Sequence, residues 1–536
     1  MSWEQIAATK RQTLKDSIPA EWVIPGEILP REDQVDVTGF PRESGFFSDE
    51  ELEITSAPAP TTLSNLSSGL WTAEQVTRAF CKTAAVAQQL TNCLSETLFE
   101  KALTRAKQLD ASFRSTGETT GPLHGLPVSL KDNLNVTGHD STIGFTSLVN
   151  KPATANSVIV DMLLEAGAIL YCKTNVPTAM MISESVNNVF GRTVNPRGRN
   201  LTTGGSSGGE AALVAFGGSR VGVGSDIGGS LRIPAACTGL FTLRPSFGRL
   251  PSALARACLE GQESVNGVIG PLAPTLEEIA LFMSTIITQR PWLRDPKCLP
   301  IPWHPVDIQP NTRLRIAILW TDGIVTPTPP VTRALSETAA KLEAVGHEVI
   351  PWEGSGHMEM EMLGLLQRMF LADGGRSVRE FLEPTGEPFR PEMRMWEEAA
   401  EMSVYELWQM HRSRNTLCRE YLSRWNEARV DALLCPTTPY SGIENGKFAY
   451  GGYTCVFNLL DYPAVSFPSG VLTDKALDAK YGVEYRPLSS LDAQIQQDYS
   501  VDNVQGMPVS LQLVGRKLEE ENLLAMTDLV LKAIAA

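Results

Sequence analysis

The sequence contains no apolar stretch long enough to cross a membrane. Every uninterrupted apolar run in the 536-residue chain is shorter than the ~18 residues that a spanning helix needs. The N-terminus, Met1-Ser-Trp-Glu-Gln, is polar and charged and lacks the pattern of a signal peptide. We therefore expect a protein without a membrane anchor that resides in the cytoplasm.

Basic charge is scarce relative to acidic charge. The chain has 46 Lys and Arg against 61 Asp and Glu, which gives a net charge of −15 at pH 7. Because nucleic acids and anionic lipids repel such a surface, the composition argues against both as partners. The apolar and charged fractions, 43% and 20%, are those of an ordinary globular protein, and the length allows a large core.

Cysteine pairs with the spacing of a metal or redox site are also missing. The nine cysteines are scattered singly, their number is odd, and no C-x-x-C motif occurs. This pattern indicates free thiols in a reducing compartment. Cys237 lies close to the glycine-rich region described below, and a small core side chain is a better interpretation of it than a nucleophile.

Nucleotide-binding motifs are absent as well. The stretch from Gly222 to Ile227 has isoleucine where the third glycine of the dinucleotide-binding fingerprint belongs. No Gly-x-x-x-x-Gly-Lys-Ser/Thr motif occurs. We expect a protein that works without a cofactor and without a metal ion.

What the chain does contain is a glycine- and serine-rich region from Gly204 to Pro234. It holds a first serine turn, residues 204–209 (GGSSGG), and a second serine turn, residues 228–230 (GGS). A good helix former, 210–216, and a strand-like run, 221–225, lie between them, so the region is no flexible linker. A serine hydroxyl among exposed N–H donors is what a nucleophile beside an oxyanion hole requires.

This region resembles the amidase signature family of serine hydrolases. The resemblance rests on GGSSGGE followed by GSDIGGSLRIPA, and it extends to Gly125-Leu-Pro-Val-Ser-Leu-Lys131 upstream and to Leu243-Arg-Pro-Ser-Phe-Gly-Arg249 downstream. The opening Ser-Trp-Glu and the later FPRESGFFSDEELEIT are similar to the fungal acetamidase-like branch. The resemblance implies hydrolysis of the C–N bond of small carboxamides to a carboxylic acid and ammonia or an amine.

The resemblance also implies a Ser–Ser–Lys triad. Matched residue by residue, Ser230 is the nucleophile that accepts the acyl group, Ser206 is the bridging serine on a cis peptide, and Lys131 is the general base and later the acid. The backbone amides implied for the oxyanion hole are those of Ile227, Gly228, Gly229 and Ser230. The implied supporting residues are Ser207 as a hydrogen-bonding partner, Asp226 and Arg232 as braces of the turn, and Met180 and Ser225 at the border of the scissile amide.

A lysine can act as the base only if it is held neutral. An unperturbed lysine titrates near pH ~10.4, and burial can lower its pKa by about 3–5 units. Lys131 directly follows the apolar strand-like run 125–130, which would bury it. Of the six histidines, only His124 adjoins a matched stretch, since it precedes Gly125, and a structural role in a loop is the preferred interpretation of it.

The match has three departures outside the triad. Thr203 stands where family members often have proline before GGSSGG, Thr242 where glycine is common, and Arg244 where lysine is usual. They are expected to affect the rigidity of the loops and leave the three reacting side chains in place.

The order of predicted elements indicates an α/β fold with a mixed sheet between helices. We predict a partly helical N-terminal arm over 1–60 and one α/β domain over 61–536, with helices at 72–90 and 96–113 and strands at 125–130, 169–172, 315–320 and 431–436 among others. The family resemblance implies closing strands at 458–470 and 506–515. The mostly helical segment 358–428 is predicted to lie over the substrate site. Loops around 180–190 and 440–460 are expected to contribute to specificity with it.

Several functions remain open at this point. One alternative is an amidotransferase subunit that hydrolyses the amide of glutamine, and others are a hydrolase of carbamates or esters and a non-catalytic member of the family. The presence of Lys131, Ser206 and Ser230 together argues against the last. The resemblance also implies a homodimer.

Overall fold

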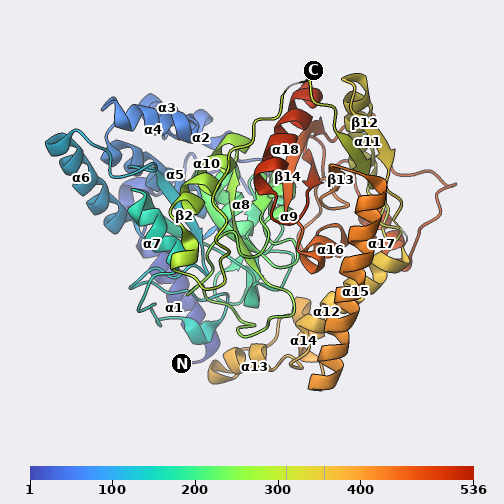
Figure 1. Ribbon diagram of the computed structural model, residues 1–536. Helices are drawn as coiled ribbons and strands as arrows, with labels where there is room; N and C mark the ends of the chain where they lie inside the picture. Colours follow the sequence, from blue (N-terminus) through green and yellow to red (C-terminus); the bar gives the residue numbers. More distant parts are fainter. Residues whose placement is uncertain (310, 355, 536) are drawn as a thin grey trace.

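The apolar strand-like runs come together in one sheet of 11 strands (Figure 1). The computed structural model describes residues 1–309, 311–354 and 356–535. The strand order across the large sheet is β1-β3-β2-β8-β10-β9-β14-β15-β13-β11-β12. In the described part of the chain, two smaller sheets, β4-β5 and β6-β7, accompany it.

The strands have the following bounds: β1 Leu94–Thr97, β2 Pro127–Lys131, β3 Ile169–Thr174, β4 Val186–Asn187, β5 Gly191–Arg192, β6 Val194–Asn195, β7 Gly198–Thr202, β8 Val221–Asp226, β9 Phe241–Arg244, β10 Val268–Ala273, β11 Arg315–Ile318, β12 Glu348–Pro351, β13 Ala432–Pro436, β14 Ala464–Leu472 and β15 Pro508–Val514.

The α-helices have the following bounds: α1 Trp3–Asp16, α2 Phe40–Glu43, α3 Asp49–Ser56, α4 Ala59–Ser67, α5 Ala73–Thr91, α6 Phe99–Thr116, α7 Val158–Glu165, α8 Gly208–Ala215, α9 Arg232–Thr238, α10 Leu276–Thr288, α11 Pro329–Ala344, α12 His357–Phe370, α13 Arg376–Leu382, α14 Arg394–Glu397, α15 Val404–Ala428, α16 Gly452–Leu460, α17 Ser490–Asp498 and α18 Glu520–Ala535.

The sheet is mixed, which confirms the predicted fold class. Strand β2 runs parallel to both β3 and β8, and β11 runs parallel to β12 and β13, whereas the remaining pairs are antiparallel. Parallel neighbours end at the same edge, so the residues that close β2 and β8 lie side by side. This edge carries the predicted site.

Both faces of the sheet are covered because its central strands are apolar on both sides. Helices α7, α10, α11 and α18 pack on one face, in a core that includes Leu170 and Leu434. Helices α5, α6, α8, α9, α12, α15 and α16 cover the other, where Tyr171 and Leu433 point. The alternation of neighbours such as Leu433 and Leu434 between the two cores is the two-residue period of a strand buried on both faces.

The N-terminal arm is joined to this body by a shared core. Ser2 caps α1 in a capping box, and Leu14 of α1 belongs to the same apolar cluster as α5 and α6. The Nζ atom of the buried Lys10 lies 2.8 Å from Oδ2 of Asp140 and also pairs with Glu96. The arm therefore buries both apolar surface and charge against the residues that follow it.

Some elements differ from the sequence predictions. The second predicted helix, 96–113, is α6, which begins at Phe99 because Leu94–Thr97 pairs with β3 as strand β1. The first residues of the predicted strand 458–470 end helix α16, and β14 begins at Ala464. Strands β9 and β10 and helix α9 had not been predicted; β9 and α9 are short, and glycine or proline interrupts the apolar pattern in α9 and β10.

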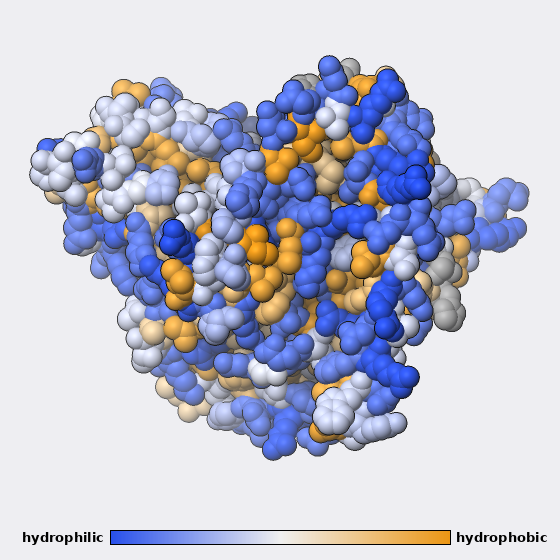
Figure 2. Space-filling view, viewed as in Figure 1, coloured by the Kyte–Doolittle hydropathy of each residue, from blue (hydrophilic) through white to orange (hydrophobic). Residues whose placement is uncertain are grey.

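The face of the molecule in view in Figure 2 is predominantly hydrophilic. No helix in the described ranges is both long and apolar enough to span a bilayer. Figure 2 shows hydrophobic atoms gathered near the centre of the face in view, where Figure 1 places the yellow-green part of the chain. Exposed apolar side chains from that part of the chain include Leu254, Leu293 and Leu299.

Candidate active site

The candidate site begins where the parallel strands β2 and β8 end. Lys131 is the last residue of β2, and Ser225 and Asp226 are the last residues of β8. Strand register pairs Leu130 with Val223, so the side chains that follow in the two strands meet at the carboxyl edge of the sheet. Open α/β sheets form their ligand sites at this edge.

The Lys131 side chain is completely buried and hydrogen-bonded to two serine hydroxyls. Its Nζ atom lies 2.7 Å from Ser206 Oγ and 2.9 Å from Ser225 Oγ. Burial lowers the pKa of the Lys131 ammonium to about 7, although the charges of Asp226 and Glu210 favour the charged form. The lysine is thus close to half neutral at physiological pH, as a proton acceptor must be.

The first serine turn brings Ser206 to Lys131 and Ser207 to the second serine turn. The Gly205–Ser206 peptide bond is cis. The Ser207 N–H donates to the Ser230 carbonyl at 3.1 Å, and its hydroxyl donates to the Ser225 carbonyl at 3.3 Å. Ser207 therefore ties the two turns together, and its supporting role at the site stays a prediction.

The second serine turn follows β8 and leads into α9. Ser230 and Ile227 are half-buried and line the same cavity as Ser206. Of the four amides predicted for the oxyanion hole, that of Gly229 donates to Asp226 Oδ1 at 2.8 Å. The amides of Ile227, Gly228 and Ser230 have no acceptor among the described residues. The structure thus leaves three of the four predicted donors for a ligand.

Asp226 and Arg232 form a buried ion pair beneath this turn. Two guanidinium nitrogens of Arg232 lie 3.1 Å from the Asp226 carboxylate, and neither side chain is exposed. Burial alone would raise the pKa of the Asp226 carboxyl, but the Arg232 charge and its hydrogen bonds outweigh burial and hold that pKa well below its ordinary value. The carboxylate also accepts hydrogen bonds from the Gly229 and Leu231 amides, so it fixes the turn.

Replacing Arg232 with methionine is expected to lower the free energy of unfolding by about 3–5 kcal/mol, because it leaves a buried carboxylate without its partner. Urea denaturation followed by circular dichroism measures the loss. Arg376→Met is the control, because that arginine is 71% exposed in its ion pairs and should change the free energy of unfolding by less than about 1 kcal/mol. An unchanged denaturation midpoint for Arg232→Met would contradict the bracing role.

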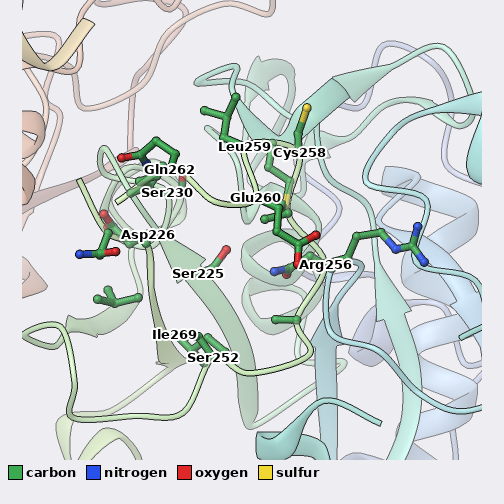
Figure 3. Close-up of a pocket in the computed structure, with 18 of the residues that line it drawn as sticks. Ser225, Asp226, Ser230, Ser252, Arg256, Cys258, Leu259, Glu260, Gln262 and Ile269 are labelled. Carbon is green, nitrogen blue, oxygen red and sulfur yellow. The ribbon is translucent and has the colours of Figure 1, made fainter. Parts of the chain in front are cut away.

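A cavity of about 360 Å³ opens next to these residues. Figure 3 shows Ser225, Asp226 and Ser230 on one side of it and Arg256, Cys258 and Glu260 on the other. Its volume lies in the range of small-molecule sites. The lining is mainly apolar, with Met180, Met181, Leu259 and Ile269 among its members. A small substrate can therefore reach the hydroxyls of Ser206, Ser225 and Ser230 from an apolar enclosure.

The opposite wall of the cavity comes from a segment that the sequence did not single out. Residues 252–262 form most of it, and Met180 from the predicted 180–190 loop contributes as well. In the described chain, 358–428 supplies no lining residue; its helices α13 and α14 pack behind Met180. Helix α15 supports the wall from outside, since Arg414 donates to the Ser264 carbonyl at 2.8 Å. The segment 358–428 thus packs around the walls of the cavity without lining it in the described chain, and its placement over the substrate stays a prediction.

Glu210 is a further buried group that the sequence reasoning left out. It follows the first serine turn and accepts hydrogen bonds from Ser129 Oγ at 2.6 Å and Thr174 Oγ1 at 2.9 Å. Burial raises the pKa of Glu210 to about 8, because these bonds offset only part of the desolvation. Because the charged form of Glu210 favours the ammonium form of Lys131, burial that keeps Glu210 neutral also helps to keep Lys131 neutral. The position of Glu210 at the end of the GGSSGGE motif is the sequence signal that could have identified it.

His124 and Cys237, for which the sequence favours structural roles, lie away from the cavity. The His124 side chain is buried, its Nδ1 atom accepts a hydrogen bond from the Thr120 amide at 3.0 Å, and it is not among the lining residues of the described chain. Cys237 is buried in α9, where burial raises the pKa of its thiol to about 12. Neither is placed to act on a substrate.

The departures from the expected motif are accommodated locally. Arg244 is buried and pairs with Asp461 at 2.8 Å, while its second terminal nitrogen donates to the Tyr462 carbonyl. Thr242 donates its hydroxyl to the Pro271 carbonyl at 2.7 Å, across the β9–β10 pair. Thr203 donates to the Gly204 carbonyl within the first serine turn. All three positions have hydrogen-bonding partners for the side chains they carry.

The chain matches the family model described as Amidase over residues 75–524. It is 41% identical over 547 aligned positions to an acetamidase of Emericella nidulans, with 99% of this chain and 98% of that protein covered. An acetamidase of Aspergillus oryzae is 37% identical over 547 positions, with 99% of each chain covered. A solved fatty acid amide hydrolase superposes with a TM-score of 0.95 at 31% identity, over 99% of this chain and 95% of that chain.

Proposed function

Because this chain belongs to the amidase family and is a hydrolase of amide C–N bonds, we propose that Ser230, Ser206 and Lys131 carry the reaction through an acyl-enzyme. The observation that supports the proposal best is the buried Lys131–Ser206 hydrogen bond of 2.7 Å beside the cavity that Ser230 lines. A lysine whose pKa is about 7 can accept a proton without a histidine.

In the first step, the Ser230 hydroxyl attacks the amide carbon and forms a C–O bond. Its proton passes to Ser206 Oγ as the Ser206 proton passes to the neutral Lys131 Nζ, which becomes an ammonium. The carbonyl oxygen becomes an oxyanion, and the amides of Ile227, Gly228 and Ser230 stabilise it. The Ser225 hydroxyl, 2.9 Å from Nζ, holds the amine in position.

The same relay then completes the reaction in reverse order. The Lys131 ammonium returns a proton through Ser206 to the amide nitrogen, the C–N bond breaks, and ammonia or an amine leaves. Water next attacks the ester on Ser230 and gives its proton to Ser206 and Lys131. Protonation of Ser230 Oγ releases the carboxylic acid and restores the starting state. Neutral Lys131 therefore acts as base and its ammonium as acid in each half of the cycle.

The cavity favours amides with an apolar acyl group. Its enclosing side chains are mostly apolar, and its volume of about 360 Å³ offers space for more than an acetyl group. The relatives are named for acetamide and for fatty acid amides. We propose that small to medium aliphatic and aryl carboxamides are the substrates, and that glutamine, whose two charges must lose water on entry, is a poorer substrate.

A series of straight-chain primary amides tests this substrate class. Each methylene buried in the cavity contributes about 0.8 kcal/mol, so kcat/KM should rise by roughly fourfold per CH₂ from acetamide until the cavity is filled. Released ammonia measures the rate. Glutamine is the control, because its carboxamide ends a chain of similar length that carries two charges. Rates that fall with chain length, or a preference for glutamine, would contradict the proposal.

The cellular compartment is proposed from the cysteines, and the oligomeric state from the family resemblance. All nine cysteines are free thiols, and most are buried. We propose a reducing compartment, the cytoplasm, as the site of action. The homodimer implied by the family resemblance stays a prediction.

A further inference from the structure

The second serine turn is held by a helix that lies more than 200 residues further along the chain. The peptide unit that joins Gly228 to Gly229 is fixed at both ends. Its carbonyl oxygen accepts hydrogen bonds from Cys455 Sγ at 3.0 Å and from Thr454 Oγ1 at 2.8 Å, both in the first turn of α16. The Thr454 hydroxyl shares its proton with the Gly451 carbonyl, which lies 2.9 Å away. The N–H of the peptide unit donates to Asp226 Oδ1 at 2.8 Å.

This peptide unit separates the amides that are free to bind an oxyanion. The free N–H of Gly228 precedes it, and the free N–H of Ser230 follows it. Glycine on both sides gives the backbone wide freedom in φ and ψ. Unless changes in ψ of Gly228 and φ of Gly229 cancel, a rotation of the unit changes the angle between the two flanking amides, which then no longer point to one place. The three hydrogen bonds therefore restrain the freedom that the glycines leave.

The packing between the turn and α16 is close enough to require glycine. Gly229 has φ of +126°, which side-chain-bearing residues rarely adopt, and a Cβ atom there would lie 2.2 Å from Thr454 Oγ1. The threonine hydroxyl thus occupies the space where a side chain of residue 229 would stand. No water-sized gap separates the helix from the turn at this point.

The same face of α16 also holds the ion pair below the turn. Asn458, four residues after Thr454 and so on the same helix face, donates through Nδ2 to Asp226 Oδ1 at 2.8 Å. Its Oδ1 accepts from Arg232 at 2.6 Å. One short helix therefore contacts the carbonyl of the turn directly and, through Asp226, the N–H of the same peptide unit.

We propose that Thr454 and Cys455 are positioning residues, which orient the oxyanion-binding amides of Gly228 and Ser230 for the hydrolysis described above. The inference rests on the proposed function and adds to it residues that act through the backbone without touching the substrate. Oriented donors contribute to catalysis because they need no rearrangement when charge develops. A loosened turn should therefore weaken binding of the transition state more than binding of the substrate.

Replacing Thr454 with valine removes the hydroxyl and keeps the shape of the side chain. Loss of one whole oxyanion donor costs about 10²–10³ in kcat, so a disordered donor should cost less: we expect kcat to fall roughly tenfold for Thr454→Val and roughly 100-fold for Thr454→Val/Cys455→Ala. KM should stay within about twofold. Thr454→Ser keeps the hydroxyl donor and Cys455→Ser replaces the thiol donor with a hydroxyl donor, so both should retain most of the activity.

A second readout separates positioning from general damage. A trifluoromethyl ketone carrying the best acyl chain forms an oxyanion when Ser230 attacks it, and its inhibition constant should rise in proportion to the loss in kcat. The corresponding alcohol forms no oxyanion, and its inhibition constant should not change. Thr527→Val is the matched control: Thr527 is buried in α18, bonds only within its own helix, and its replacement should leave kcat unaltered.

The inference is overturned if Thr454→Val and the double variant, both folded, keep the wild-type kcat, or if ketone and alcohol lose affinity equally. If the double variant fails to fold, the kcat values of Thr454→Val and Thr454→Ser alone test the inference. Failure of the proposed function has a different signature, since the wild-type protein would then neither release ammonia from any amide nor be inhibited by the ketone.

Discussion

Ser230→Ala is expected to lower kcat for amide hydrolysis by roughly 10⁴- to 10⁶-fold, the range seen when a serine hydrolase loses its nucleophile. The alanine removes the oxygen that forms the bond to the acyl carbon, while the neighbouring Ser206, Ser225 and Lys131 remain. We expect neither Ser206 nor Ser225 to replace it, because the hydroxyls of both accept hydrogen bonds from Lys131. Released ammonia and the rate of covalent labelling by a fluorophosphonate measure the loss.

Ser252→Ala is the matched control for this change. Ser252 lines the same cavity, on the wall formed by 252–262, and its hydrogen bonds in the described chain come from its backbone, whose amide donates to Asp295 and whose carbonyl accepts from the Ala255 amide. Its replacement should leave kcat within about twofold of the wild type. Labelling should occur in Ser252→Ala and be lost in Ser230→Ala. A folded Ser230→Ala protein with near wild-type turnover would remove this residue from the mechanism.

The groups that meet at the site were predictable because each is unusual where it stands. Lys131 closes a strand whose other residues are mostly apolar, so the pattern itself indicated a buried amine. The two serine turns sit between elements with enough apolar residues to pack, which distinguished them from linkers. The mixed sheet followed from the alternation of apolar runs with helical patterns. These signals are local in the sequence.

What was missed depends on contacts between distant parts of the chain. The wall formed by 252–262 has no helical or strand periodicity, and only the tertiary structure places it opposite Ser225. Helix α16 reads as a continuation of an apolar strand, because Val456–Leu460 is mostly apolar. Its contact with Gly228 spans 226 residues. The spacing of residues along the sequence cannot show which of two apolar segments will contact a given turn.

Lys131→Met is expected to lower kcat for amides by roughly 10²- to 10⁴-fold, the usual contribution of a general acid or base. Methionine fills a similar volume and has no charge to bury, so the variant should be at least as resistant to urea as the wild type. Hydrolysis of an ester with a good leaving group should suffer less, because such a leaving group departs without being protonated. The ratio of amide to ester rates measures this difference.

The pH dependence of kcat/KM tests the role of Lys131 as the base more directly. Only the neutral amine accepts the proton, and the pKa of Lys131 is about 7, so kcat/KM of the wild type should rise tenfold per pH unit below about pH 7 and level off above it. The residual kcat/KM of Lys131→Met should not show this rise with pH. Lys173→Met is the control, because Lys173 is equally buried at the neighbouring strand β3 but lies outside the cavity lining of the described chain. Two results would contradict the relay through Ser206 and indicate that another group is the base. One is a rise of kcat/KM below about pH 7 that persists in Lys131→Met. The other is the loss of this rise in a folded Lys173→Met.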